Sequence, residues 1–202
     1  LSHTGALVSD LRAIEAACRA AGVVRVSTPK RLVDAAHALL SGRVPRGRRA
    51  AVYADGGGHG VIATDVLAAA GFDVPPLSEG TTSALRGLLP ATASVRNPVD
   101  FAGGDRELGS FAEVGRLLLA SGEVDAVLLS GYFGGWAIDV PQVADEEVGV
   151  ARRLAAAAAE SGRPLVVHTW YPDSPAAAEL RRGGVPVYGE IESAVAALAL
   201  LA

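Results

Sequence analysis

The sequence predicts an α/β protein with a five-stranded parallel sheet and helices on both faces. From residue 50 onward, short runs rich in Val and Leu alternate with amphipathic helical segments. That alternation is typical of a parallel sheet covered on both sides. Half of the 202 residues are hydrophobic, which is enough to bury a full core.

The first 46 residues predict a helix–strand–helix unit. Apolar residues keep helical spacing over 7–21, and Gly22 is a helix stop. A strand is expected at 23–26, and Thr28-Pro29 begins a second helix that continues to residue 40. This piece is too small to bury its own apolar faces, so we expect residues 1–46 to be the C-terminal part of another α/β domain.

Residues 47–202 are expected to form the main domain. The predicted strands are 50–54, 72–74, 126–130, 165–168 and 186–188, and the predicted helices are 59–70, 81–89, 107–120, 145–161, 174–182 and 191–201. The link over 91–105 is expected to be irregular. Five such strands favour the flavodoxin-like order 2-1-3-4-5, in which ligands bind at the carboxyl ends of strands one and three.

Two glycine-rich loops follow those two strands. Residues 55–60 read Asp-Gly-Gly-Gly-His-Gly, and residues 131–136 read Gly-Tyr-Phe-Gly-Gly-Trp. Glycines adopt positive φ and let backbone N–H groups approach an oxyanion, and the start of a helix adds its positive end. The predicted phosphate-binding residues are Gly57, Gly58, His59, Gly60 and Val61. A tight turn that binds no ligand is the alternative.

Other polar residues at this sheet edge are open to two interpretations. Asp55 either makes the turn through backbone N–H groups or binds a ligand directly. His59 either donates to a phosphate or points to water, and His168 ends strand four on the same edge. Asn97 and Asp100 lie in the irregular link, where they form a substrate-binding loop or a structural one.

Composition excludes several classes of protein. The net charge of −4 gives no field that would recruit nucleic acid, and no apolar run approaches the ~20 residues of a membrane span. Cys18 is the single cysteine, so there is neither a disulfide framework nor a metal signature, and a reducing cytoplasm is expected. Because the sequence begins with Leu1 and has no methionine, we interpret it as a fragment of a longer chain.

His3 stands directly before the first predicted helix, in the segment Ser2-His3-Thr4-Gly5-Ala6. By position alone it is unremarkable, but a neutral imidazole can act as a nucleophile towards a phosphoryl group. Five segments now form an ordered pattern: 2–7 (SHTGAL), 20–26 (AAGVVRV), 55–61 (DGGGHGV), 94–100 (SVRNPVD) and 184–188 (GVPVY). Together they resemble the NDP-forming (ADP-forming) acyl-CoA synthetases, relatives of succinyl-CoA synthetase, over nearly the whole chain.

The resemblance implies a role for each part of the chain. His3 would carry the phosphoryl group at the end of a succinyl-CoA-ligase-like domain, and residues 47–202 would be the flavodoxin-like CoA-ligase domain. The implied reaction joins a carboxylic acid to CoA while a nucleoside triphosphate becomes diphosphate and phosphate, through acyl phosphate and phosphohistidine. The CoA-binding Rossmann domain and the ATP-grasp domain, which would hold CoA, ATP or ADP and the accompanying Mg, would be fused or separate partners in an oligomer.

The chain departs from the family pattern at one turn. The usual family turn resembles Asn-Ala-Gly-Gly-Pro-Gly, whereas this chain has Asp55-Gly-Gly-Gly-His59-Gly60. A carboxylate near a phosphate is unfavourable unless Asp55 turns away or binds amides. Two other functions stay open: a non-catalytic synthetase-like sensor domain of a protein acetyltransferase, and a flavodoxin-like nucleotide-binding module.

Overall fold

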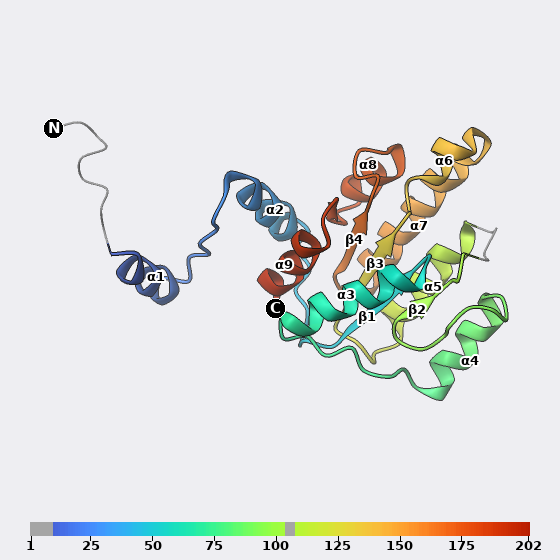
Figure 1. Ribbon diagram of the computed structural model, residues 1–202, viewed down its shortest axis with the longest axis horizontal. Helices are drawn as coiled ribbons and strands as arrows, with labels where there is room; N and C mark the ends of the chain where they lie inside the picture. The colour runs from blue at the N-terminus through green and yellow to red at the C-terminus, as the bar shows by residue number, and fades with distance from the viewer. Residues whose placement is uncertain (1–9, 104–107) are drawn as a thin grey trace. The chain divides into compact units, whose positions relative to one another are not determined.

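The computed structural model describes residues 10–103 and 108–202. The helices and strands within these ranges are, in chain order, α1 (Leu11–Ala20), α2 (Pro29–Leu40), β1 (Ala50–Ala54), α3 (Gly57–Ala69), α4 (Glu79–Leu88), β2 (Val99–Asp100), α5 (Gly109–Ala120), β3 (Ala126–Gly131), α6 (Trp136–Asp139), the 3-10 turn η1 (Pro141–Val143), α7 (Ala144–Ser161), β4 (Leu165–Thr169), α8 (Pro175–Arg182), β5 (Val187–Tyr188) and α9 (Ile191–Leu201). From β1 onward, each strand is followed by one or more helices (Figure 1).

The chain forms two compact units that divide between Val33 and Asp34. The second half of α2 therefore packs with the larger unit. The Tyr188 hydroxyl donates to the backbone oxygen of Asp34, and the Ser193 hydroxyl donates to its carboxylate. Arg43 donates to the carbonyl of Gly184. Our division of the chain into domains at 1–46 and 47–202 remains a proposal.

The larger unit contains the predicted parallel sheet. Its strand order is β2-β1-β3-β4-β5, and every neighbouring pair is parallel. The order 2-1-3-4-5 and the α/β class are therefore confirmed. Side chains of α4, α5, α7 and α8 form one hydrophobic core with the sheet, while those of α2, α3 and α9 form another.

The identity of the second strand corrects our prediction. Residues 72–74 do not form a strand. Only Asp73 bridges to Arg49, near the amino end of β1, and β2 lies instead at Val99–Asp100, within the link expected to be irregular. Between the Arg49–Asp73 bridge and the pairing of β1 with β2, a side chain bonds to the backbone of β1. The Asn97 amide accepts from Val52 N–H and donates to the carbonyls of Ala50 and Pro75, each at 2.9 Å.

A second correction concerns residues 23–26. They have no regular secondary structure, and Val23 and Val24 are about half exposed. Among the described residues no strand lies beside them, and a strand needs a neighbour to satisfy its backbone groups. The two helices predicted on either side are present as α1 and α2. At the start of α1, the Asp10 side chain accepts a hydrogen bond from Arg12 N–H.

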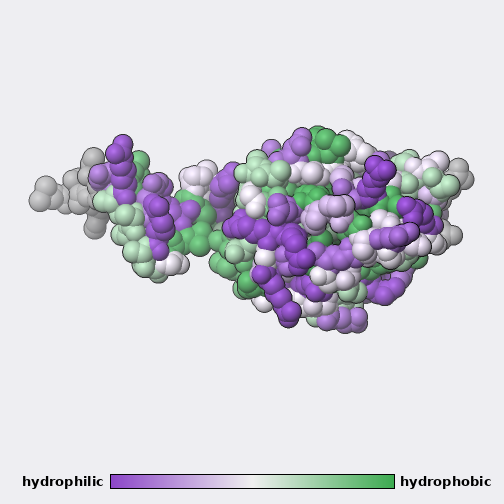
Figure 2. Space-filling model, turned by 90° about the horizontal axis from the view of Figure 1, so that it is seen from below, coloured by the Kyte–Doolittle hydropathy of each residue, from purple (hydrophilic) through white to green (hydrophobic). Residues whose placement is uncertain are grey.

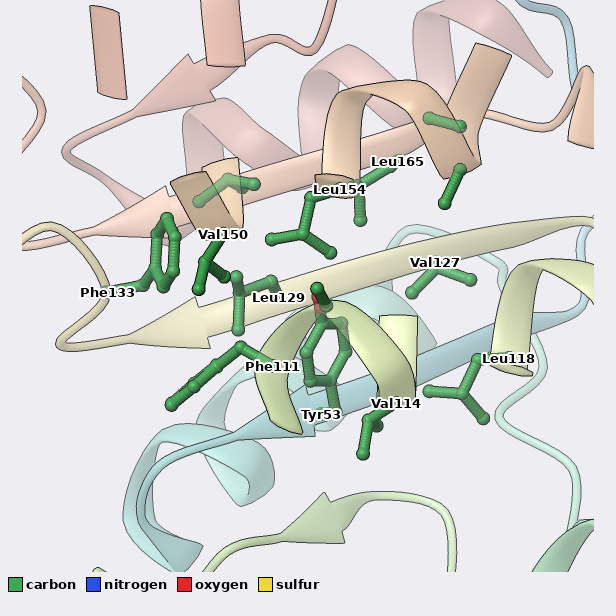
Figure 3. Close-up of a cluster of buried hydrophobic side chains, with 14 of the residues drawn as sticks. Tyr53, Phe111, Val114, Leu118, Val127, Leu129, Phe133, Val150, Leu154 and Leu165 are labelled. Atoms are coloured by element: carbon green, nitrogen blue, oxygen red, sulfur yellow. The ribbon is translucent and has the colours of Figure 1, made fainter. Parts of the chain in front are cut away.

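The core that supports the site lies between β1, β3 and the helices α5 and α7. Figure 3 shows Tyr53, Phe111 and Leu129 converging there, and all three are at most 2% exposed. On the face drawn in Figure 2, hydrophilic and hydrophobic residues are interspersed over the larger unit. None of the helices in the described ranges combines the length and apolar character that crossing a bilayer requires.

Candidate functional site

Asp55 ties together the two glycine-rich loops at the carboxyl edge of the sheet. It follows β1, and its Oδ2 accepts a hydrogen bond of 3.1 Å from the N–H of Tyr132, which follows β3. Its Oδ1 lies 3.1 Å from Nδ1 of His59. The two loops are therefore neighbours at this edge of the sheet, and the Asp55 carboxylate is engaged with an amide and an imidazole.

The start of α3 presents unsatisfied backbone donors. Its N-cap is Gly56, which has no side chain to cap the helix. The N–H groups of His59 and Gly60 both donate to the Gly56 carbonyl, so the donors left over at this terminus are those of Gly57 and Gly58. An ideal Cβ on Gly58 would meet no atom within 4 Å, so the space beside it is open.

Two glycines of this turn, Gly57 and Gly60, are needed for space rather than for a left-handed backbone. We expected positive φ here, but none of the residues 56–60 has it. A Cβ on Gly60 would lie 3.2 Å from Pro98, and one on Gly57 would lie 2.9 Å from Oδ2 of Asp100. The Asp100 carboxylate thus lies beside the start of α3, where its Oδ1 accepts from Ala102 N–H.

A pocket of about 320 Å³ opens beside His59. It is lined by His59, Ile62, Ser130, His168, Trp170, Gly189, Glu190, Ile191 and Glu192, so it lies between the N-termini of α3 and α9 at the ends of β3, β4 and β5. The His59 ring meets the Trp170 ring edge-on, with 4.7 Å between centroids. Apolar walls around a few polar groups are typical of small-ligand sites.

Ser130 and His168 form the floor of this pocket. They are paired directly across β3 and β4, and the Ser130 hydroxyl lies 2.9 Å from His168 Nδ1. His168 is only 7% exposed. Burial lowers the pKa of His168 below its ordinary value, and the nearby His59 lowers it further, while Glu192 and Asp55 oppose this. We therefore treat His168 as neutral near pH 7.

The second glycine loop is held by a buried carboxylate. Glu147, on α7, accepts the N–H groups of Gly134, Trp136 and Ala137. Burial raises the pKa of Glu147, although these three bonds oppose that shift. The glutamate thus takes the place of an external anion at the short helix α6.

The predicted site residues fall into three groups. His3 lies outside the described residues. Gly57, Gly58 and His59 stand at the start of α3, whereas Gly60 N–H is bonded within the turn and the Val61 side chain is exposed. Asn97 and Asp100 both lie at the edge of the sheet. The side-chain amide of Asn97 bonds to the backbone of β1 where a neighbouring strand would otherwise do so, and Asp100 belongs to β2. Their predicted part in a substrate loop stays a prediction.

Sequence reasoning missed the pairing of Ser130 with His168 and the place of Trp170 in the pocket. A signal for the pairing was available, because both residues stand near the carboxyl ends of strands predicted to be neighbours. Within 10–103 and 108–202, no three His, Cys, Asp or Glu side chains are placed to hold a metal ion.

Comparison with known proteins finds that the chain is similar to CoA ligases. Residues 1–39 match the family model of the succinyl-CoA ligase like flavodoxin domain. Two subunits of Pyrococcus furiosus match nearly all of the chain: the alpha subunit of ADP-forming acetate–CoA ligase II is 29% identical over 97% of it, and that of ligase I is 30% identical over 99% of it. The chain spans about two fifths (42%) of each relative's length.

Solved structures agree on the fold. The dinucleotide-forming acetyl-coenzyme A synthetase 1 of Ca. Korarchaeum cryptofilum, solved in complex with phosphate and ADP, superposes with a TM-score of 0.79 at 24% identity, covering 98% of this chain and 42% of that one. A Pyrococcus horikoshii protein superposes with a TM-score of 0.76 at 25% identity, covering 96% of this chain and 44% of its own. The family match and the curated relatives identify the chain as a member of an NDP-forming acyl-CoA synthetase-like family.

Proposed function

We propose that the chain is part of an NDP-forming acyl-CoA synthetase, which joins a carboxylic acid to CoA while a nucleoside triphosphate is converted to diphosphate and phosphate. Its relatives include acetate–CoA and 4-hydroxybutyrate–CoA ligases that form ADP. Those relatives are longer than this chain, so CoA, the nucleotide with its Mg, and the remaining chemistry are assigned to a CoA-binding Rossmann domain and an ATP-grasp domain, fused or separate, in a cytoplasmic oligomer.

In this proposal the phosphoryl group travels on His3. The imidazole attacks the terminal phosphorus of the triphosphate and releases the diphosphate. The carboxylate oxygen of the acid then attacks the phosphohistidine to give an acyl phosphate, which frees the imidazole. The CoA sulfur attacks the acyl carbon, and phosphate leaves as the thiol proton passes to solvent or base.

The start of α3 is the observation that carries the proposal. Two N–H groups, those of Gly57 and Gly58, have no acceptor among the described residues, and His59 is fixed beside them. A helix N-terminus with free donors favours a phosphate or an acyl phosphate oxygen. Gly60 and Val61, included in the predicted cradle, contribute shape rather than donors.

The test uses the complete protein with its nucleotide- and CoA-binding parts. Incubation with terminally labelled ATP and Mg should give an acid-labile, base-stable phosphoprotein, the behaviour of a phosphoramidate. His3→Ala should lose both the label and acyl-CoA formation. His59→Ala should keep the label and lose on the order of 10²-fold or less in rate, as for one removed donor to a transition state.

His37→Ala is the matched control, because His37 is an exposed histidine on α2 and should change neither readout. Label that persists in His3→Ala and vanishes in His59→Ala would transfer the carrier role to His59. A complete protein that binds nucleotide or acyl-CoA but is never labelled would favour the sensor or nucleotide-binding alternatives.

A further inference from the structure

Trp170 lines two cavities at the carboxyl edge of the sheet. It directly follows β4, and its side chain is 60% exposed. One cavity is the pocket of about 320 Å³ beside His59, and the other, of about 430 Å³, extends from Ile138 on α6 along residues 170–175. Because one indole borders both cavities, we treat them as one surface and call the residues that line them the Trp170 surface.

The Trp170 surface exposes large apolar side chains. Ile62 on α3, Ile138 on α6 and Trp170 are each more than half exposed, so three separate elements contribute to it. Exposed apolar groups that gather in this way mark interaction sites. Tryptophan is also enriched among the residues that dominate the energy of protein interfaces.

The segment that carries Trp170 is held in place by its neighbours. The Trp170 N–H donates to the Gly131 carbonyl at 3.2 Å, and Arg181 donates to the Pro172 carbonyl at 2.6 Å. The His59 ring meets the indole edge-on. A surface that is already ordered loses little conformational freedom when a partner binds.

The charge of the Trp170 surface indicates the chemistry of its occupant. Asp173, Glu190 and Glu192 line it, and no Lys or Arg does among the described residues. The loops after β1, β3, β4 and β5 share this bias, because together they contain nine Asp or Glu residues and no Lys or Arg over 55–65, 132–147, 170–175 and 189–192. Complementary potentials select binding partners, so these cavities favour a basic occupant and disfavour a free anion such as a nucleotide.

The arrangement also favours a polypeptide over a compact ligand. Two cavities that share one indole suit two side chains of a single segment, each filling one cavity. Phosphoryl transfer requires positive charge around the transferred group, and none of these four loops supplies it from Lys or Arg. A basic partner would bring that charge to this edge of the sheet.

We propose that the Trp170 surface docks a polypeptide segment from the remaining part of the synthetase, one that presents large apolar side chains flanked by Lys or Arg. The origin of the segment rests on the proposed function. Its chemistry rests on the cavities and the charges of this chain.

Hydroxyl-radical oxidation of the complete protein, read by mass spectrometry, tests the docking. Trp136 is an internal reference with the same side-chain chemistry, and its indole nitrogen is buried. An uncovered Trp170 should be oxidised several-fold faster than Trp136, whereas a docked segment should slow Trp170 to the rate of Trp136 or below. The protection should be lost in 1 M NaCl, where the Debye length is about 3 Å.

Charge reversal tests the basic character of the partner. Asp173→Lys combined with Glu192→Lys should expose Trp170 and raise its oxidation several-fold. Asp65→Lys combined with Glu146→Lys is the matched control, because these exposed residues line neither cavity, and it should leave the protection intact. Protection that survives both the salt and the reversal at 173 and 192 would overturn a basic partner.

Carbodiimide coupling, which joins a carboxylate to a lysine amine, locates the partner. Asp173 and Glu192 should couple to lysines outside this sequence. Lys30 is the only lysine within it, so coupling to Lys30 would indicate this chain or a second copy of it as the occupant and would overturn the proposal.

The docking and the proposed function fail in different ways. If the complete protein is labelled by ATP and forms acyl-CoA while Trp170 is oxidised several-fold faster than Trp136, the function stands and the docking is wrong. If Trp170 is protected until its surrounding charges are reversed, but no phosphoprotein or acyl-CoA forms, the docking stands and the function is wrong.

Discussion

Asn97→Ala should be among the most damaging single substitutions at the sheet edge, and it should act on stability. The side-chain amide makes three hydrogen bonds of 2.9 Å to backbone groups. Val52 and Ala50 are fully buried, so the truncation leaves a buried N–H and a buried carbonyl without this partner. Pro75 is partly exposed, so water can replace its lost bond.

The magnitude follows from the two buried groups. Leaving a buried donor or acceptor unsatisfied costs about 1–3 kcal/mol each. The carbonyl has a second lone pair, so we expect a total loss of about 2–4 kcal/mol in the free energy of unfolding. For a domain of this size that lowers Tm by roughly 5–15 °C.

Urea unfolding monitored by circular dichroism measures this loss, provided that the variant and the unaltered chain have the same m-value. Asn97→Asp keeps the acceptor for Val52 but loses both donations and places a carboxylate near two carbonyls. It should be at least as unstable as Asn97→Ala at pH 7. Arg96→Ala, at the exposed neighbouring position, should change the free energy of unfolding by no more than about 0.5 kcal/mol. A loss below about 1 kcal/mol in Asn97→Ala would refute the view that this side chain replaces strand backbone.

Three further outcomes are expected. Tyr53→Phe should raise the free energy of unfolding by about 1 kcal/mol in urea titrations, because the buried Tyr53 hydroxyl has no hydrogen-bond partner. A clear decrease in that free energy would contradict the absence of a partner. Gly131→Ala should cost more than Gly122→Ala, since both have positive φ but only a Cβ at 131 would overlap Asp55; equal costs in unfolding would contradict the crowding. Because burial lowers the pKa of His168 below 6.5, the unfolded chain binds more protons there, so stability should fall as pH drops below about 6.5. His168→Gln should remove that part of the slope.

The central strands were predictable because their signal lies in their own residues. Residues 50–54 are an apolar run, and residues 126–131 and 165–169 are apolar up to their last two residues, Ser-Gly and His-Thr, as is typical of strands buried on both faces. Their shared direction then brings Asp55 and Tyr132 to one edge. The meeting of the two loops could therefore be predicted before any side-chain contact was known.

The second strand could not be predicted in the same way. Residues 72–74 have a better strand composition than Val99–Asp100, yet only Asp73 pairs with β1. The deciding interaction is made by the Asn97 side chain, which no periodicity records. Likewise, the contact between Asp55 and His59 depends on the room left by Gly131, a residue 72 positions beyond His59 in the sequence.

The short outer strands have a consequence for the tendency of the protein to aggregate. An exposed strand edge offers unpaired N–H and C=O groups to other chains, which is how sheets recruit strands and aggregate. Here each outer strand is only two residues long, Val99–Asp100 and Val187–Tyr188, and each is directly preceded by a proline that has no N–H to offer. The long apolar strands lie inside, so this sheet gives an incoming strand little backbone on which to grow.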